Sequence, residues 1–431
     1  MPESEGFMNG RQKELFVRKE SRVAASYLKK LSEMPDTPEA MKPLFQVLKN
    51  IYVDLQDISG KNERKTIGTY CVMIPPELIY AAGAIPVRLC SGNYTAYSIG
   101  DEAVPRDACP LVKAVMGFGL AQVSPLYREC SLMVIPVTCD CKKKLAGMLE
   151  QIKPTVSLHV PTSKDEDAMI EQYTEELYRL IPVLEKTTGS RIDTETLSGA
   201  VWDVADAQRE IPRFLSFVQN TPALLHGTQV LAVMNTFSYI PVQSWAKQMH
   251  LLNEEMQEKL AQKRYVGKEK NPRILVTGSP MIFPNIKIPL LIEEMGGTLV
   301  GDETCMGERG LYDPVVVEDK SFRGMMRALA GRYIRPCTCP SFIDNSQRVY
   351  RIKQMIKDHR VQGVIYHVLR GCLVYDYEYQ VFEEELGKLD VPVIRVESDY
   401  NEEDVEQLRI RIEAFMELIK LKDYARKRSG E

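Results

Sequence analysis

The chain has 431 residues, more than one hydrophobic core normally supports, so we expect two domains. Its 55 Lys and Arg against 59 Asp and Glu lack the basic excess of a protein that binds nucleic acid. No apolar run reaches the ~20 residues needed to span a bilayer, and the N-terminus has no segment typical of a signal peptide, so we expect a cytoplasmic protein.

Residues 1–65 are polar and charged, with apolar residues at helical spacing, such as Val23, Tyr27 and Leu31. This spacing predicts helices. We interpret them as an N-terminal extension that caps the first core, with a contact to a second subunit as the alternative.

Residues 66–162 change to an α/β pattern. Short apolar runs predict strands in TIGTYCVMI, IPVRL and SLMVIPVT, and the last run is of the continuous type found in parallel sheets. PPELIYAAG has a proline in its first turn and Gly83 as its stop, which predicts a helix, as does ACPLVKAVMGFGLA. This order of elements predicts a Rossmann-like domain.

Residues 163–270 are charged and helical, which predicts an intervening helical segment. Residues 271–431 form a second α/β unit, with strands in RILVTG, TLVGDET, VQGVIYHVLR and VPVIRVES and a long amphipathic helix at the end. The fold class is therefore predicted as α/β, with two Rossmann-like parallel-sheet domains, a helical N-terminal extension, a helical insertion and a C-terminal helix.

The two α/β units share an order of events. PELIYAAGAIPVRL matches IPLLIEEMGGTLVG, and SLMVIPVTCD matches VQGVIYHVLRGC. This similarity indicates an internal duplication, with the inserted helices between its two copies.

The chain has ten cysteines, and in a reducing compartment they are expected to be buried thiols, metal ligands or redox groups. Most of them lie near the ends of predicted strands, where open parallel sheets bind ligands. They are Cys71, Cys109, Cys139, Cys141, Cys305, Cys337, Cys339 and Cys372. For Cys90 and Cys130 we predict plain packing.

Structural zinc prefers tight pairs such as C-x-x-C, whereas this chain has only C-x-C pairs, so iron–sulfur chemistry suits the set better. Three cysteines per unit would leave one iron of a cubane without a protein thiolate, and such an open position is where a metal centre performs chemistry. Cys109, followed by Pro110, is expected near a helix N-terminus that stabilises its thiolate.

The segments GTYCVMIPPELIYAAGAIPVRL, RDACP, VTCD, DETCMGERG, GVIYHVLRGC and ESDYNEEDVEQLRIRIEAFMEL run in order from residue 68 to about 418. Together they resemble the 2-hydroxyacyl-CoA dehydratase family of iron–sulfur proteins. Because cysteines occupy ligand positions in both units, the chain resembles the double-cubane cluster branch of that family.

The resemblance implies an [8Fe-9S] double cubane, or alternatively one [4Fe-4S] cluster. Cys71, Cys109 and Cys139 would hold one cubane, and Cys305, Cys337 and Cys372 the other. Cys141 is the alternate for Cys139, and Cys339 the alternate for Cys337. The reactive position would be the open iron or the bridging sulfide.

The resemblance also implies the activity and the partners. We expect an oxygen-sensitive iron–sulfur oxidoreductase that reduces small molecules, acts as a homodimer, and receives low-potential electrons from an ATP-hydrolysing [4Fe-4S] activator protein. The alternatives are a subunit of a 2-hydroxyacyl-CoA dehydratase, which is a radical lyase, and a non-enzymatic electron or cluster carrier.

Charged groups near the sulfurs would tune such a centre. The candidates are Arg309, Arg370 and Lys142 to Lys144, each with a solvated surface charge as the alternative, which we favour for the lysines. His367 is expected to be a satisfied core histidine.

Overall fold

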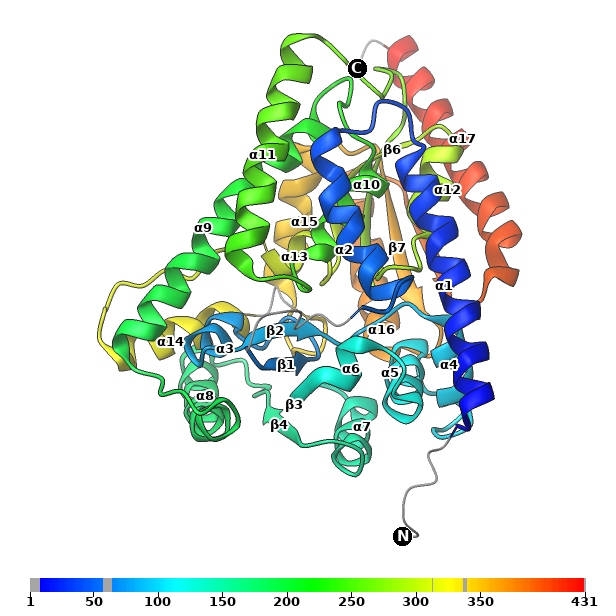
Figure 1. The fold of residues 1–431 in the computed structure, drawn as a ribbon. Coiled ribbons are helices and arrows are strands. Elements are labelled where there is room, and N and C mark those ends of the chain that lie inside the picture. Colours follow the sequence, from blue (N-terminus) through cyan, green and yellow to red (C-terminus); the bar gives the residue numbers. More distant parts are fainter. Residues whose placement is uncertain (1–7, 57–63, 312, 336–338, 430–431) are drawn as a thin grey trace.

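The computed structural model describes residues 8–56, 64–311, 313–335 and 339–429. Two lobes are stacked in the view of Figure 1, and each lobe is built on a parallel four-stranded sheet. The lower lobe carries the first sheet, and the upper lobe carries the second sheet together with the N- and C-terminal helices.

The two sheets have the same topology. The first sheet has the order β2-β1-β3-β4, from β1 (Thr66–Thr69), β2 (Ile85–Arg88), β3 (Cys130–Val137) and β4 (Thr155–His159). The second has the order β6-β5-β7-β8, from β5 (Arg273–Gly278), β6 (Thr298–Glu303), β7 (Gly363–Leu369) and β8 (Val393–Ser398). Each strand of the first sheet thus has a counterpart in the second, four strands later, as the internal similarity of the sequence indicates.

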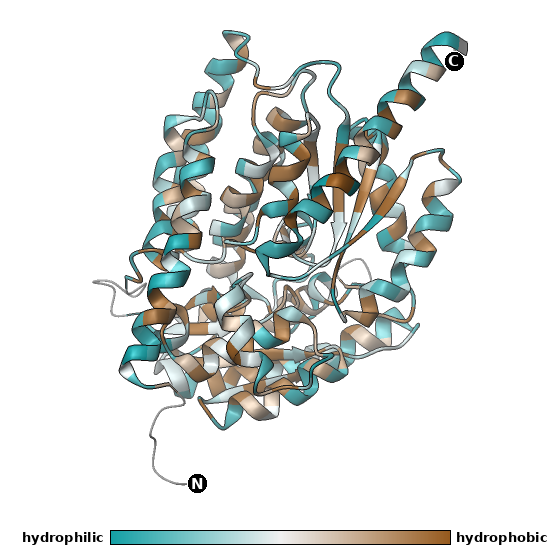
Figure 2. Cartoon of the chain, turned by 90° about the vertical axis from the view of Figure 1, so that its right-hand side faces the viewer, coloured by the Kyte–Doolittle hydropathy of each residue, from teal (hydrophilic) through white to brown (hydrophobic). Residues whose placement is uncertain are grey.

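The central strands are covered on both faces. In β3, Leu132 and Val134 join one hydrophobic cluster, whereas Met133 and Ile135 join another. Successive side chains of a strand point to opposite faces, so a continuous apolar run is what a sheet buried on both sides requires. Figure 2 shows the apolar residues concentrated in the strands and the inner helices, with hydrophilic residues on the outer helices.

Two details differ from the sequence prediction. The strand β4 is not predicted from the sequence, because it is an edge strand of which only Leu158 is buried and it lacks a continuous apolar run. The predicted first strand is also too long, because β1 ends at Thr69 and the chain turns at Cys71.

Helices follow the strands in both lobes. In the first lobe these are α3 (Pro76–Ala81), α4 (Tyr94–Asp101), α5 (Pro110–Ala121), α6 (Pro125–Glu129) and α7 (Asp140–Glu150). After the strands of the second sheet the chain forms α12 (Lys287–Glu294), α13 (Glu308–Leu311), α14 (Phe322–Tyr333), α15 (Ser346–Asp358), α16 (Leu373–Gly387), η3 (Glu402–Asp404) and α17 (Val405–Ser429).

The remaining helices come before the first sheet or between the two sheets in the chain. They are α1 (Gly10–Ser32), η1 (Glu39–Met41), α2 (Lys42–Tyr52), α8 (Glu166–Thr188), α9 (Thr194–Gln219), α10 (Gly227–Thr236) and α11 (Val242–Ala261). The aromatic ring of Phe16 in α1 packs on Phe118 of the first lobe, with ring centres 5.8 Å apart. By contrast, α2 packs on α10, and the hydroxyl of Tyr52 lies 2.8 Å from that of Tyr239. The N-terminal helices therefore do more than cap the first core.

The hydrophobic contacts also cross the predicted boundaries. Helix α14, which follows β6 in the chain, packs on α8, and both contribute side chains to the cluster behind the first sheet. The predicted fold class is confirmed by the two parallel sheets and the helical segments. None of the helices in the described ranges is long and apolar enough to cross a membrane.

His367 joins the end of β7 to neighbouring segments and is a core histidine, as predicted. Its Nδ1 donates to the carbonyl oxygen of Ser279 at 3.0 Å, and its Nε2 accepts from the hydroxyl of Ser398 at 2.8 Å. Burial lowers the pKa of His367 to about 4, so the folded protein keeps this imidazole neutral.

We predict that this histidine makes the fold acid-sensitive. An unfolded histidine binds a proton near pH 6.5, so between pH 6.5 and pH 4 the unfolded chain binds more protons than the folded one. Its contribution to the free energy of unfolding should therefore be complete above pH 6.5 and fall by up to about 3 kcal/mol as the pH drops to 4. Urea unfolding at a series of pH values measures this.

Between pH 4 and pH 6.5, the free energy of unfolding should change less with pH in His367→Gln than in the wild type. His159→Gln, which replaces an exposed histidine, should show the same pH dependence as the wild type. Equal slopes for wild type and His367→Gln would contradict the prediction.

Candidate functional site

One cavity lies where the carboxyl ends of the two sheets meet. Its walls come from the segments that directly follow β1, β2, β3, β5, β6 and β7. The empty space is about 810 Å³, with the opening to solvent included. Among the described residues, seven cysteines from both halves of the chain line it: Cys71, Cys90, Cys109, Cys139, Cys305, Cys339 and Cys372.

Five of the six cysteines predicted as ligands are among these seven, and the sixth, Cys337, lies outside the described residues. Its alternate, Cys339, lines the cavity. Of the other pair, Cys139 lines the cavity and Cys141 does not. Cys130 is also absent from this wall, and its thiol donates to the carbonyl oxygen of Tyr127 in the core.

Cys90 also lines the cavity, although the sequence predicts that it only packs in the core. It is buried in the core, and it lies two residues after the end of β2. Cys305 lies at the same offset after β6, the counterpart of β2. The internal duplication, applied residue by residue, would have given the two cysteines equivalent roles.

Three of the cysteines occupy helix N-termini. Cys109 is the N-cap of α5, Cys139 the N-cap of α7 and Cys372 the N-cap of α16. The free backbone N–H groups and the dipole of a helix favour negative charge at this end. Three helices therefore direct their positive ends at one cavity, which suits thiolates or an anionic cluster.

Cys109 shows this effect. The pKa of its thiol is lowered to about 7 by a hydrogen bond from the Cys372 thiol and by the backbone N–H groups of Val112 and Leu111, against the opposing effect of burial. The same bond, together with burial, raises the pKa of Cys372 well above its usual value. A cysteine of the first unit therefore contacts a cysteine of the second.

The backbone brings these two loops together. Gly371 has a φ of 74°, and a Cβ there would lie 2.7 Å from the carbonyl oxygen of Asp107, two residues before Cys109. Only glycine adopts this φ readily and leaves room for such an approach. Cys71 also has a positive φ, 79°, which is rare for a residue other than glycine and costs on the order of 1 kcal/mol. Such strain is found at functional sites more often than elsewhere.

The charged side chains that the described residues contribute to the cavity wall are all cations. Its wall includes the cations Arg88 and Lys142, and no carboxylate among the described residues. Burial disfavours the Cys71 thiolate, but the charges of Lys142 and Arg88 outweigh it and hold the pKa of Cys71 below the usual value. Burial likewise opposes the charge of Lys142, whose pKa is nevertheless raised because the surrounding cysteines favour the cation.

The prediction that the lysine run is a solvated face is therefore wrong for one member. Lys142 is half-buried against the cysteines, whereas Lys143 and Lys144 are exposed. The reason is the helical turn of α7, which places successive lysines on different sides.

Arg309 is fully buried, so the alternative of a solvated charge is wrong for it. Its Nε lies 2.8 Å from Glu303, and its Nη1 donates to the hydroxyl of Tyr375 at 2.7 Å. Tyr375 lines the cavity, so Arg309 positions part of its wall, and the charge of Arg309 also opposes the effect of burial on the pKa of Cys305. Arg370, in contrast, has an exposed side chain that pairs with Asp399 at 2.9 Å.

The donor set fits an iron–sulfur cluster. Burial raises the pKa of Cys305 to about 12 and also raises the pKa of Cys339, so these thiols would ionise only against a bound metal or cation. Among the described residues, no three His, Cys, Asp or Glu side chains are placed to bind one metal ion. A cubane takes one thiolate per iron, so its ligands surround a volume instead of a point.

Comparison with known proteins gives a family. Residues 71–419 match the family described as 2-hydroxyglutaryl-CoA dehydratase, D-component, and this span includes every cysteine of the cavity. The chain is 30% identical to the "Putative dehydratase subunit YjiM" of Escherichia coli (strain K12), over 90% of this chain and 100% of that protein.

Two further relatives are more distant. The chain is 24% identical to the (R)-phenyllactyl-CoA dehydratase beta subunit of Clostridium sporogenes and 22% identical to one of the subunits of the benzoyl-CoA reductase of Thauera aromatica. Each alignment covers 83% of this chain and 92% of the relative. These relatives are named for a dehydration and for a reduction, so similarity alone does not choose between the two reactions.

We predict that Gly371→Ala separates the two cysteine loops. The new Cβ would meet the backbone of Asp107 in an unfavourable φ region, at a cost of about 1–3 kcal/mol in the free energy of unfolding. Gly147→Ala is the matched control, because Gly147 is exposed within α7 and a Cβ there meets nothing within 4 Å.

Thermal unfolding checks both variants: Gly371→Ala should melt at a lower temperature, and Gly147→Ala at an equal or higher one. A Gly371→Ala protein as stable as the wild type would show that the close approach of the loops is not required.

Proposed function

Because the chain belongs to the 2-hydroxyglutaryl-CoA dehydratase D-component family, we propose that it is an iron–sulfur reductase that acts on small molecules at a double-cubane cluster. One observation carries the proposal: cysteines from both halves of the chain line a single cavity. Two cubanes held there would share one space and could be bridged.

The proposed ligands are Cys71, Cys109 and Cys139 for one cubane, and Cys305, Cys372 and either Cys337 or Cys339 for the other. The position of Cys339 in the cavity wall supports Cys339. Since the thiols of Cys109 and Cys372 are close enough to hydrogen-bond across the two halves, cubanes held by them would lie side by side. When bound, the [8Fe-9S] group supplies low-potential single electrons for the reduction.

The protein's own groups would then hold the negative charge of the reduced state. The N-termini of α5, α7 and α16 point N–H groups at the sulfurs, and Lys142 adds a full positive charge. The apolar wall, with Ile282, Leu369 and Val374, would keep water from the sulfurs.

The electrons would come from a partner, which we propose to be an ATP-hydrolysing [4Fe-4S] activator protein. The chain has no P-loop or dinucleotide fingerprint of its own. The turn after β5, where a nucleotide-binding loop often lies, instead places Ser279 and Pro280 in the cysteine cavity. We further propose that the chain acts as a homodimer in the cytoplasm.

The second candidate is a subunit of a 2-hydroxyacyl-CoA dehydratase, a radical lyase with one [4Fe-4S] cluster in each subunit. The similarity to the (R)-phenyllactyl-CoA dehydratase beta subunit favours it. It would leave part of the cysteine wall without iron, and it would need a sequence-distinct second subunit for activity.

We predict about eight irons per chain, and about nine acid-labile sulfides, for protein purified without oxygen; one cubane would give about four of each. The count is made together with an electron paramagnetic resonance spectrum of the reduced protein. About four irons per chain would overturn the double-cubane proposal and support the dehydratase, and absence of iron would overturn both.

The ligand assignment is tested by matched serine variants. Cys139→Ser and Cys372→Ser should each lower the iron content, because a hydroxyl replaces a soft thiolate. Cys141→Ser should leave the iron content unchanged, since Cys141 lies outside the cavity wall. Iron loss in Cys141→Ser with full iron in Cys139→Ser would reverse the assignment.

We also predict that Lys142→Met makes the reduction potential of the cluster more negative, because a cation beside the cluster stabilises its reduced form. A shift on the order of 50 mV is expected for one half-buried charge. A redox titration followed by electron paramagnetic resonance measures it, with the exposed Lys143→Met as the control. Equal potentials for both variants and the wild type would contradict the role of Lys142.

A further inference from the structure

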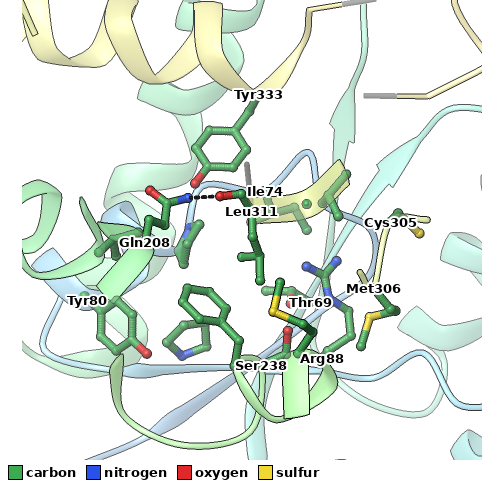
Figure 3. Close-up of a pocket in the computed structure, with 17 residues that line it drawn as sticks. Thr69, Ile74, Tyr80, Arg88, Gln208, Ser238, Cys305, Met306, Leu311 and Tyr333 are labelled. Atoms are coloured by element: carbon green, nitrogen blue, oxygen red, sulfur yellow. Dashed lines mark hydrogen bonds between the residues drawn. The ribbon is translucent and has the colours of Figure 1, made fainter. Parts of the chain in front are cut away.

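A second pocket, drawn in Figure 3, adjoins the cysteine cavity and shares part of its wall. Arg88, Cys305 and Met306 line both spaces. Its empty space is about 650 Å³, opening included. The other walls come from β1, α3, α9, α10, α13 and α14, so both halves of the chain build it.

The pocket carries one charge. Among the described residues that line it, Arg88 is the only charged side chain, and no carboxylate is present. The neutral polar groups are already engaged in part: the hydroxyl of Tyr80 accepts from the backbone N–H of Val242 at 3.1 Å, and the amide of Gln208 donates to the carbonyl oxygen of Leu311 at 3.4 Å. The electrostatic character of the pocket is therefore set by Arg88.

Arg88 has no carboxylate partner in the described part of the chain; the groups of opposite charge near it would be ionised cysteines. Its Nε is buried and makes no hydrogen bond, and no carboxylate pairs with its guanidinium. Its backbone N–H, in contrast, is fixed by the carbonyl oxygen of Ser238 at 3.1 Å. Figure 3 shows the guanidinium projecting into the pocket between Leu311 and the Cys305–Met306 segment.

The Arg88 guanidinium in the second pocket would be stabilised by a bound anion. Arginine does not lose its proton in proteins, and a half-buried, unpaired guanidinium is costly. Its planar fork matches a carboxylate or another small oxyanion, which it binds with two parallel hydrogen bonds.

We propose that this pocket binds the substrate through Arg88, and that the substrate is a small molecule with a single carboxylate or similar oxyanion group. Bound there, the molecule lies against Cys305 and Met306, which also line the cysteine cavity. One arginine suits one negative charge; the several phosphate charges of a CoA thioester would find no further cation in this wall. The identification of the anion as substrate rests on the proposed reductase function, whereas its binding does not.

The competing role for Arg88 is to balance the charge of the cysteine thiolates. Arg88 and Lys142 both line the cysteine cavity, but Lys142 does not line the second pocket. A purely balancing role requires no ligand in the second pocket, so a direct binding measurement separates the two roles.

The test uses the full chain, purified without oxygen, with formate and acetate as probes and ligand-observed proton NMR as the readout. Acetamide serves as the neutral counterpart of acetate. Arg88→Met should weaken acetate binding at least tenfold, and Arg88→Lys, which keeps the charge but loses the fork, should weaken it less. Arg191→Met, at an exposed arginine, is the matched control and should bind acetate like the wild type.

The inference is overturned if neither anion binds the wild type, if acetamide binds as well as acetate, or if Arg88→Met keeps the affinity of the wild type. Should Arg88→Met fail to fold, as thermal unfolding would show, Arg88→Gln and Arg88→Lys carry the same comparison. The iron count is made on the same samples. Arginine-dependent binding without iron would defeat the proposed reductase and leave the pocket standing, and about eight irons without anion binding would do the reverse.

Discussion

The structure depends on two parallel sheets that present their carboxyl ends to the same space. A parallel sheet collects the ends of its strands on one edge, and ligand-binding loops gather there. Here two sheets of identical topology contribute such an edge to one cavity, so loops that lie some 200 residues apart in the chain become neighbours. The contact between Cys109 and Cys372 is the most direct consequence.

That arrangement creates an electrostatic problem and also its solution. Three helix N-termini and the cations Arg88 and Lys142 point at a cavity with an apolar wall and no carboxylate among the described residues. Without negative charge in the cavity, these positive groups would repel one another. Neutral thiols would not reduce this repulsion. Ionised cysteines around a cluster would supply the missing charge, which is why the donor set and the surrounding charges support the same proposal.

The sequence was informative where it reports on strands and on their ends. Short apolar runs predicted seven of the eight strands that the described residues form, although the first was predicted too long, and they also located most of the cysteines beyond strand ends. It failed where the deciding contact is distant. The lysine run looked like a solvated face, because the cysteines that surround Lys142 come together only in the folded chain. The half-exposed strand β4 carried too little apolar pattern to be recognised.

The duplication also shows how one position can serve two purposes. Arg88 and Glu303 are the last residues of β2 and β6, the equivalent edge strands of the two sheets. Glu303 is fully buried, and although burial favours its neutral form, Arg309 and Arg348 hold its pKa at about 2. Glu303 is therefore paired with two arginines inside the protein, and these ion pairs hold the wall of the cavity in place. Arg88 has no carboxylate counterion among the described residues, and its charge acts on the two spaces that it faces. In the first half the strand end serves the site, and in the second half it serves the scaffold that holds the site.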